Sequence, residues 1–299
     1  MAAIFAQPDF PSKYERMLGN CTRIVAAEMV RIDSPPISPT SYVLDNACGP
    51  GIVTEQVKLL QPQTKILAGD VSPAMVEDVK QKIESKGWKN VETEELDMRN
   101  LSKLADNTFT HVLTNFGTFV PNEPGSTLLA IKEMYRVLQI GGVAVTTLWA
   151  GNFLMSLLVS MTDKVDRAWL TAFYETARLV RPLEEPREAM KIEPEMLKGS
   201  WLLKQLEDGG FGNNVEVRSC LTSTSAASLD ELVENVMLSA PFFFGGYSEQ
   251  ELFQAKPILK QKLQEVRTFQ ELEGGAVKIG MKAWIGVGRK KGDEMEVAL

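Results

Sequence analysis

Hydrophobic runs alternate with segments of helical apolar spacing along the first half of the chain. The runs predict strands over 42–47, 65–68, 91–96, 110–115 and 143–149. The segments between them predict helices over 52–60, 73–86 and 126–138, the last ending before Gly141 and Gly142. Strands and helices that alternate in this way are typical of a parallel sheet with helices on both faces.

The remaining segments flank this alternating core. Apolar spacing between Tyr14 and Met29 predicts one helix within residues 1–40, followed by a proline-rich connector. Further helices are expected over most of 152–198 and over 201–207, 229–238 and 249–269, and strands over 215–221 and 278–287. We expect one domain over 1–299. Its cap elements would be 1–40, 151–200 and 225–272, and its sheet core 41–150, 201–224 and 273–290.

Composition and charge narrow the class of partner. The formal net charge is -7, and no Lys/Arg cluster offsets it, so neither nucleic acid nor an anionic membrane is expected as a partner. The most apolar stretch, 143–161, is interrupted by polar residues, and the N-terminus lacks the apolar core of a signal peptide. Cys21, Cys48 and Cys220 are widely spaced, which fits a cytoplasmic protein and predicts no metal site.

The segment 42–51 is the strongest candidate for a binding site. A hydrophobic strand carries Asp45 near its end and leads through Gly49 and Gly51 into a helix. The glycines allow a ligand to approach the backbone, and the helix start presents free N–H groups. A dinucleotide-binding turn would have a third glycine where Thr54 stands. Since Asp45 would repel a phosphate, the turn favours a cationic ligand.

This segment, VLDNACGPG, resembles the first motif of class I S-adenosylmethionine-dependent methyltransferases, and the blocks that follow keep the order of that family. They are ILAGDVSPAMV, EELDMRNL, FTHVLTNFGTFVP, EMYRVLQIGGVAVTTLW and LLKQLEDGGF, and the resemblance extends over residues 42–221. It implies an α/β, Rossmann-like sheet of seven mostly parallel strands in the order 3-2-1-4-5-7-6, with a helical cap. It also implies S-adenosyl-L-methionine as the cofactor.

The resemblance implies roles for individual residues. Asp70 would bind the two ribose hydroxyls, Asp97 would accept a hydrogen bond from the adenine amino group, and Met98 would flank the ring. Tyr14 and Thr22 would lie near the methionine carboxylate, or would only pack the N-terminal helix onto the sheet. The expected cofactor-binding residues are Tyr14, Thr22, Asp45, Ala47, Gly49, Gly51, Asp70, Val71, Met75, Asp97, Met98, Asn115 and Phe116.

A closer resemblance is to fungal gliotoxin-type thiomethyltransferases. VLDNACG, THV with a following FG, the Gly-Phe before the sixth strand and the helices inserted between the last two strands carry it. It implies methyl transfer to a small, mainly apolar secondary metabolite, at S or N and possibly at O. Two alternatives stay open: a methyltransferase-like protein that binds the cofactor but catalyses a non-methylating reaction or regulates a partner, and a protein methyltransferase.

No histidine is expected to act as a catalytic base, and catalysis would come mostly from proximity and orientation. His111, the only histidine, would lie at the amino end of its strand, about 13 Å from Asn115. Without a histidine base, a thiol or a neutral amine is favoured over an alcohol, although Asp, Glu or Tyr could assist an alcohol. Apolar residues that would line an acceptor pocket, or else form a packing cluster, are Phe119, Trp149, Phe153, Met237, Phe243 and Tyr247.

Overall fold

A mixed sheet of eight strands organises the part of the chain that the computed structural model describes: residues 7–31, 33, 35–118, 123, 125–150, 168–181, 194–240 and 247–292. The strands are β1 (Tyr42–Asn46), β2 (Lys65–Asp70), β3 (Val91–Glu95), β4 (Phe109–Asn115), β5 (Leu138–Trp149), β6 (Val215–Ala226), β7 (Phe269–Glu271) and β8 (Val277–Arg289). Their order is β3-β2-β1-β4-β5-β8-β6, with β7 paired to β8. The expected order is confirmed, and the short β7 makes the sheet one strand larger than expected.

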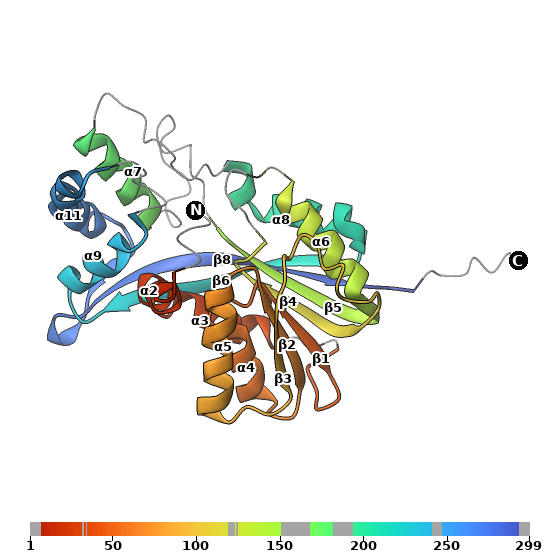
Figure 1. Ribbon diagram of the computed structural model, residues 1–299. Coiled ribbons are helices and arrows are strands. Elements are labelled where there is room, and N and C mark those ends of the chain that lie inside the picture. The colour runs from red at the N-terminus through yellow and green to blue at the C-terminus, as the bar shows by residue number, and fades with distance from the viewer. Residues whose placement is uncertain are drawn as a thin grey trace, which may run out of the picture.

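Helices cover both faces of this sheet (Figure 1). The described helices are α2 (Phe10–Leu18), α3 (Cys21–Met29), α4 (Ile52–Leu60), α5 (Pro73–Lys86), α6 (Ser126–Val137), α7 (Ala168–Val180), α8 (Gly199–Leu206), α9 (Leu229–Met237) and α11 (Glu249–Gln264). Val43 and Val145 pack with α3 and α4 on one face, whereas Leu44 and Ala144 pack with α6 and α8 on the other. Successive residues of a strand therefore contribute alternately to two separate hydrophobic cores, because side chains alternate between the two faces of a sheet.

Several boundaries differ from the sequence prediction, and strand β6 continues past its predicted end at Leu221 to Ala226. The prediction of a single N-terminal helix is wrong, because α2 and α3 are separated at Gly19, which has a φ of 55°. A Cβ added at Gly19 would lie 2.8 Å from Thr224 Oγ1 of β6. Strand β5 begins at Leu138 and includes Gly141 and Gly142. An added Cβ at Gly142 would lie 2.8 Å from the carbonyl oxygen of Thr110, so glycine at this position lets β5 lie close to β4. Helix α11 ends at Gln264, and β7 follows it.

The β6–β8 pair is longer than the rest of the sheet. Strand β6 pairs with β8 from Val277 to Gly288, whereas β5 pairs with β8 only from Ala283 to Arg289. Residues of α7, α9 and α11 form a separate hydrophobic cluster against the protruding end of β8 (Figure 1). No helix in the described ranges has the length and apolarity needed to cross a membrane.

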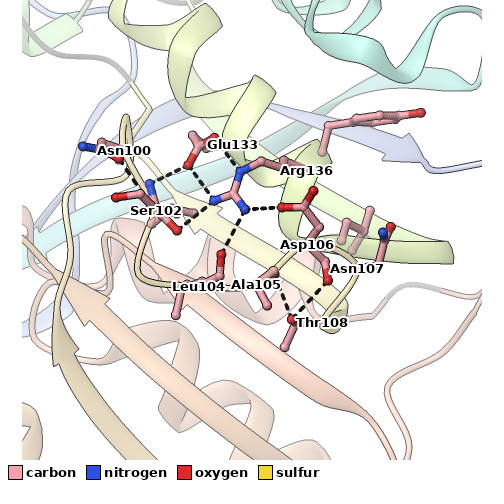
Figure 2. Close-up of polar contacts among 12 residues, drawn as sticks. Asn100, Ser102, Leu104, Ala105, Asp106, Asn107, Thr108, Glu133 and Arg136 are labelled. Carbon is pink, nitrogen blue, oxygen red and sulfur yellow. Dashed lines mark hydrogen bonds and ion pairs between the residues drawn. The ribbon is translucent and has the colours of Figure 1, made fainter.

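Arg136 of α6 fixes the loop that joins β3 to β4 (Figure 2). Its guanidinium donates to the carbonyl oxygens of Leu101 at 2.7 Å and Leu104 at 2.9 Å, and pairs with the Asp106 carboxylate at 2.5 Å. Glu133, one helical turn earlier, pairs with the same guanidinium at 2.8 Å and accepts the backbone N–H of Leu101 at 2.6 Å. These contacts raise the pKa of Arg136 and lower that of Glu133. The loop is therefore held against α6 by an ionised pair.

Candidate functional site

Two residues in the left-handed backbone region mark the carboxyl ends of neighbouring strands. Ala47 follows β1 with a φ of 57°, and Phe116 follows β4 with a φ of 58°. For residues with a side chain this conformation costs roughly 1–3 kcal/mol, and such strain concentrates at functional sites. The two turns touch, because a Cβ added at Gly117 would lie 2.6 Å from the Cβ of Ala47. The strained turns identify this edge of the sheet as the candidate site.

Gly117→Ala is expected to destabilise the protein by about 1–3 kcal/mol, because the new methyl group would overlap Ala47 and also Thr114, at 2.9 Å. Chemical denaturation would measure the change. Gly280→Ala is the control, since its nearest neighbour would be the Cβ of Thr268 at 3.3 Å. Equal losses in both variants would contradict tight contact between the two turns.

The glycine turn after β1 leaves open space at the start of α4. Gly49 has a φ of 52°, and a Cβ added there would meet no atom within 4 Å. Gly51, the N-cap of α4, has a φ of 79°, and its added Cβ would lie 3.0 Å from Val79 Cγ2 of α5. Gly51 is thus required by packing between helices, whereas Gly49 provides a backbone surface that a ligand can approach.

Asp70 is held at the end of β2 by two backbone groups. The N–H of Gly49 donates to Asp70 Oδ2 at 2.8 Å, and the N–H of Ser72 donates to Oδ1 at 2.9 Å. The side chain is mostly buried, and burial raises its pKa. Each carboxylate oxygen has two acceptor positions, so both oxygens can still accept from a ligand. The arrangement suits two neighbouring hydroxyl groups.

Asp45 has one carboxylate oxygen satisfied and one without a partner. The backbone N–H and the hydroxyl of Thr54 donate to its Oδ2 at 2.9 and 2.7 Å. Its Oδ1 is buried and has no hydrogen-bond partner. Burial raises the pKa of Asp45 to about 7, and the neighbouring Asp70 adds to the rise. A buried acceptor of this kind can be satisfied by a donor or cation from a ligand.

Helices α2 and α3 lie against the same edge. Asn115 at the end of β4 donates through Nδ2 to the carbonyl oxygen of Thr22 in α3 at 3.0 Å, while its Oδ1 accepts from Thr147 Oγ1 at 2.8 Å. The buried Thr22 Oγ1 has no partner. Burial and the nearby Cys21 and Asp70 raise the pKa of Tyr14 in α2, so its phenol stays protonated. The N-terminal helices therefore contribute polar groups to the site.

Lys82 of α5 ties α2 to the glycine turn. Its ammonium group donates to the carbonyl oxygen of Pro50 at 2.9 Å and to Glu15 of α2 at 3.1 Å. Asp78 pairs with the same group at 2.9 Å. These contacts hold the N-terminal helix and the turn together around the open space at Gly49.

The other predicted cofactor residues surround the ends of β2 and β3. Asp97 lies in the loop after β3, and its carboxylate is paired with Arg99 at 2.7 Å. Val71 is exposed, whereas Met75 and Met98 are buried beneath the surface. Among these residues, the exposed Val71 and the partly exposed Asp97 can reach a ligand without a rearrangement of the core.

An aromatic pair lies at the ends of β4 and β5. The rings of Phe116 and Trp149 are stacked with centroids 3.9 Å apart at an angle of 16°. The backbone N–H of Phe116 donates to Thr147 Oγ1 at 2.9 Å, which fixes the strained turn. Both aromatic residues are partly exposed. The pair offers a rigid apolar surface beside the glycine turn.

The remaining predicted pocket residues do not join this surface among the described residues. Met237 and Tyr247 pack against the cluster under α7, α9 and α11, where the Tyr247 hydroxyl donates to the carbonyl oxygen of Ala177 at 3.0 Å. Phe119, Phe153 and Phe243 lie outside the described residues.

His111 and the cysteines have structural surroundings. His111 is buried near the amino end of β4, and its ring nitrogens lie 2.8 Å from Thr110 Oγ1 and 3.0 Å from the carbonyl oxygen of Pro35. Burial lowers its pKa. Burial also raises the pKa of the Cys48 thiol well above its usual value and that of Cys21 to about 12. Within the described ranges, no group of three His, Cys, Asp or Glu residues is placed to hold a metal ion.

Sequence reasoning missed several polar residues at this edge. Asn46 is completely buried with no partner for its amide atoms, Thr54 clamps Asp45, and Thr147 joins Asn115 to Phe116. Asn46 and Thr147 could have been noticed as polar residues at the ends of otherwise hydrophobic strands. Thr54 and Arg99 give no such signal in the sequence, because their hydrogen bonds to Asp45 and Asp97 depend on how the chain folds after each strand.

Comparison with known proteins finds similar sequences among methyltransferases. Residues 43–142 match the family described as a methyltransferase domain. Methyltransferase ktnA of Aspergillus niger is 34% identical over 137 residues, which are 40% of this chain and 45% of the relative. Acetylaranotin bis-thiomethyltransferase of Aspergillus terreus is 32% identical over 112 residues, which are 36% of this chain and 35% of the relative. The matched segments thus span less than half of either relative.

Solved structures share the fold at low sequence identity. A putative methyltransferase of Bacillus halodurans is 15% identical with a TM-score of 0.57, covering 89% of this chain and 99% of that one. Phosphoethanolamine N-methyltransferase 2 of Haemonchus contortus, solved with S-adenosylhomocysteine, is 13% identical with a TM-score of 0.55, covering 95% and 58%. The 4+2 cyclase SpnF is 15% identical with a TM-score of 0.50, covering 90% and 81%. Residues 43–142 therefore match a methyltransferase domain, and the described part of the chain has the Rossmann-like α/β fold of these solved methyltransferases.

Proposed function

We propose that the protein transfers a methyl group from S-adenosyl-L-methionine to a small, mainly apolar acceptor, at sulfur or nitrogen in preference to oxygen. The observation that carries the proposal is the arrangement of Asp70 beside Gly49. A mostly buried carboxylate with spare acceptor positions faces a turn whose backbone is open to a ligand. The ribose of the cofactor has the two adjacent hydroxyls that this carboxylate can accept.

The other residues of the edge fit the rest of the cofactor. The unpartnered Asp45 Oδ1 can accept from the amino group of the methionine portion, and the unpartnered Thr22 Oγ1 can donate to its carboxylate. The cofactor would supply an electrophilic methyl group on a sulfonium centre. The protein's contribution would be to hold cofactor and acceptor in line, and orientation of this kind can supply roughly 7–11 kcal/mol.

The acceptor would lie against the aromatic pair formed by Phe116 and Trp149. Its flat apolar face suits an apolar ring or chain. Tyr14 has a raised pKa and His111 is engaged elsewhere, so neither is suited to remove a proton from an alcohol. A thiol or a neutral amine needs less help, which favours S- or N-methylation. The name of the Aspergillus terreus relative, a bis-thiomethyltransferase, supports sulfur, and that of the Haemonchus enzyme supports nitrogen.

The net charge of -7 supports a small molecule as partner in preference to nucleic acid or an anionic membrane. The three cysteines, whose side chains form no disulfide, support a cytoplasmic location. Fungal relatives named as methyltransferases support an acceptor from secondary metabolism.

Calorimetric titration with S-adenosylhomocysteine tests the cofactor, with NAD as the control. We expect micromolar binding of S-adenosylhomocysteine and none of NAD, because Thr54 stands where a dinucleotide-binding turn would have its third glycine. Dithiols, amines and phenols would then be screened as acceptors by mass spectrometry. Absence of binding by folded protein would overturn the proposed cofactor.

A second candidate function is a non-methylating reaction on the same cofactor-binding fold. The observation that favours it is the likeness to SpnF, which has this fold but is named as a cyclase and not as a methyltransferase. Product analysis separates the two: an acceptor that gains the mass of a methyl group supports transfer, whereas an isomer of unchanged mass supports cyclisation.

A further inference from the structure

The loop after β3 holds a carboxylate and a guanidinium that are locked together. We propose that Arg99 is a positioning residue that aims Asp97 at position 6 of the purine, so that the site selects a 6-amino purine over a 6-oxo purine. The inference rests on the proposed function, and concerns a residue that touches Asp97 and not the cofactor itself.

Arg99 contacts Asp97 through side chain and backbone. Its backbone N–H and its Nε donate to Asp97 Oδ1, both at 2.9 Å. Its Nη2 donates to Asp97 Oδ2 at 2.7 Å, and its Nε is 3.2 Å from the same oxygen. A planar guanidinium that grips both oxygens leaves the carboxylate little freedom to rotate.

The grip leaves one direction for a further hydrogen bond. Oδ1 accepts two donors at 2.9 Å, whereas Oδ2 accepts one donor at 2.7 Å and has a longer contact at 3.2 Å with the Nε that already donates to Oδ1, so Oδ2 has the less occupied acceptor position. About a third of the Asp97 side chain is exposed, so this position can be reached by a ligand. The Arg99 pair also lowers the pKa of Asp97, so that it offers only an acceptor at neutral pH.

Arg99 itself is anchored on the far side. Its Nη1 contacts the carboxylate of Glu123, which precedes α6. The loop beyond Arg99 is fastened to α6 through Arg136, which donates to the carbonyl oxygen of Leu104 as Figure 2 shows, and through Glu133, which accepts from the backbone N–H of Leu101. The guanidinium is therefore fixed at both ends and can hold Asp97 in one orientation.

The location of Asp97 places it beside the proposed ribose site. Glu95 at the end of β3 pairs with Asp70 at the end of β2, and the backbone N–H of Leu96 donates to the carbonyl oxygen of Asp70 at 3.0 Å. Asp97 is the next residue. A base joined to a ribose at Asp70 can thus reach Asp97, where an amino group would donate to Oδ2 and a carbonyl oxygen would be repelled.

The test compares S-adenosylhomocysteine with S-inosylhomocysteine, which has a carbonyl group in place of the 6-amino group. Calorimetry gives the two dissociation constants for the wild type, Arg99→Gln and Arg99→Lys. We expect the wild type to prefer the adenosyl compound roughly 10- to 100-fold, the value of a hydrogen bond to a charged group. In Arg99→Gln the preference should fall to about threefold or less, and Arg99→Lys should not restore it, since an ammonium cannot grip both oxygens.

Arg31→Gln is the matched control, because Arg31 pairs with Glu28 on the exposed surface of the N-terminal segment. It should leave the preference unchanged. If the role of Arg99 is purely structural, Arg99→Gln would weaken the binding of both ligands equally and keep the ratio of their dissociation constants. That result would overturn the inference while the proposed function stands. Equal wild-type affinities would also overturn it, and binding of neither ligand would overturn the proposed function itself. Thermal unfolding shows whether each variant is folded. If Arg99→Gln does not fold, the ratio of the two dissociation constants in Arg99→Lys decides the test.

Discussion

Asp70→Ala is expected to weaken the binding of S-adenosylhomocysteine by at least about a hundredfold. Two hydroxyl groups that donate to one carboxylate contribute roughly 1.5–3 kcal/mol each, and a loss of about 3 kcal/mol corresponds to a factor above 100. The change also frees the N–H groups of Gly49 and Ser72, which now donate to this carboxylate at 2.8 and 2.9 Å. The glycine turn would therefore lose its support together with its ligand contact.

Calorimetric titration measures the affinity, and circular dichroism reports whether the variant is folded. Glu92→Ala is the control, because Glu92 is an exposed carboxylate on β3 whose strand runs beside β2. Glu92→Ala removes the same charge without touching the site, and this variant should bind S-adenosylhomocysteine with the affinity of the wild type. Unchanged affinity in folded Asp70→Ala would refute the assignment of Asp70 to the ribose.

Asp45→Asn is expected to remove a large pH dependence from the stability of the protein. Burial raises the pKa of Asp45 to about 7, from 3.8 for an unperturbed carboxyl group. Between these values the unfolded chain releases the proton while the native protein keeps it. The wild type therefore loses stability as the pH rises through this window, and the loss is complete once the pH exceeds the native pKa.

The asparagine keeps the shape of the protonated acid and its acceptor toward Thr54, without a charge to bury. Relative to wild type, the variant should gain roughly 3 kcal/mol in free energy of unfolding between pH 5 and pH 8. Urea denaturation at both pH values measures this difference, and Asp9→Asn, at an exposed position in the segment before α2, is the control. A difference that does not change with pH would contradict a raised pKa at Asp45.

The hydrophobic pattern was sufficient for the central part of the fold. Strands β1, β2 and β4 and helices α4, α5 and α6 begin and end within a few residues of their predicted bounds. Local periodicity decides these elements, because each buries one face against a neighbour that is also periodic. The acids near the strand ends, Asp45 and Asp70, followed from the same pattern and from the rule that parallel sheets bind at their carboxyl ends.

The break between α2 and α3 could not be read from the sequence. Apolar residues continue at helical spacing across Gly19, and one uninterrupted helix satisfies the local pattern equally well. The chain turns there because β6, about two hundred residues later, places Thr224 against Gly19. In the same way β7 replaces the end of a predicted helix because β8 offers an unpaired edge.

For the site, the sequence by itself determined which residues follow the parallel strands: Asp45, the glycine turn, Asp70, Asp97 and Asn115. Only the tertiary structure decided how these groups are held, with Asp70 on two backbone N–H groups, Asp97 on Arg99 and Asn115 between Thr22 and Thr147. The physical reason is the range of the interactions. Periodicity and strand ends are properties of consecutive residues, whereas orientation, burial and pKa depend on partners that folding brings from distant segments.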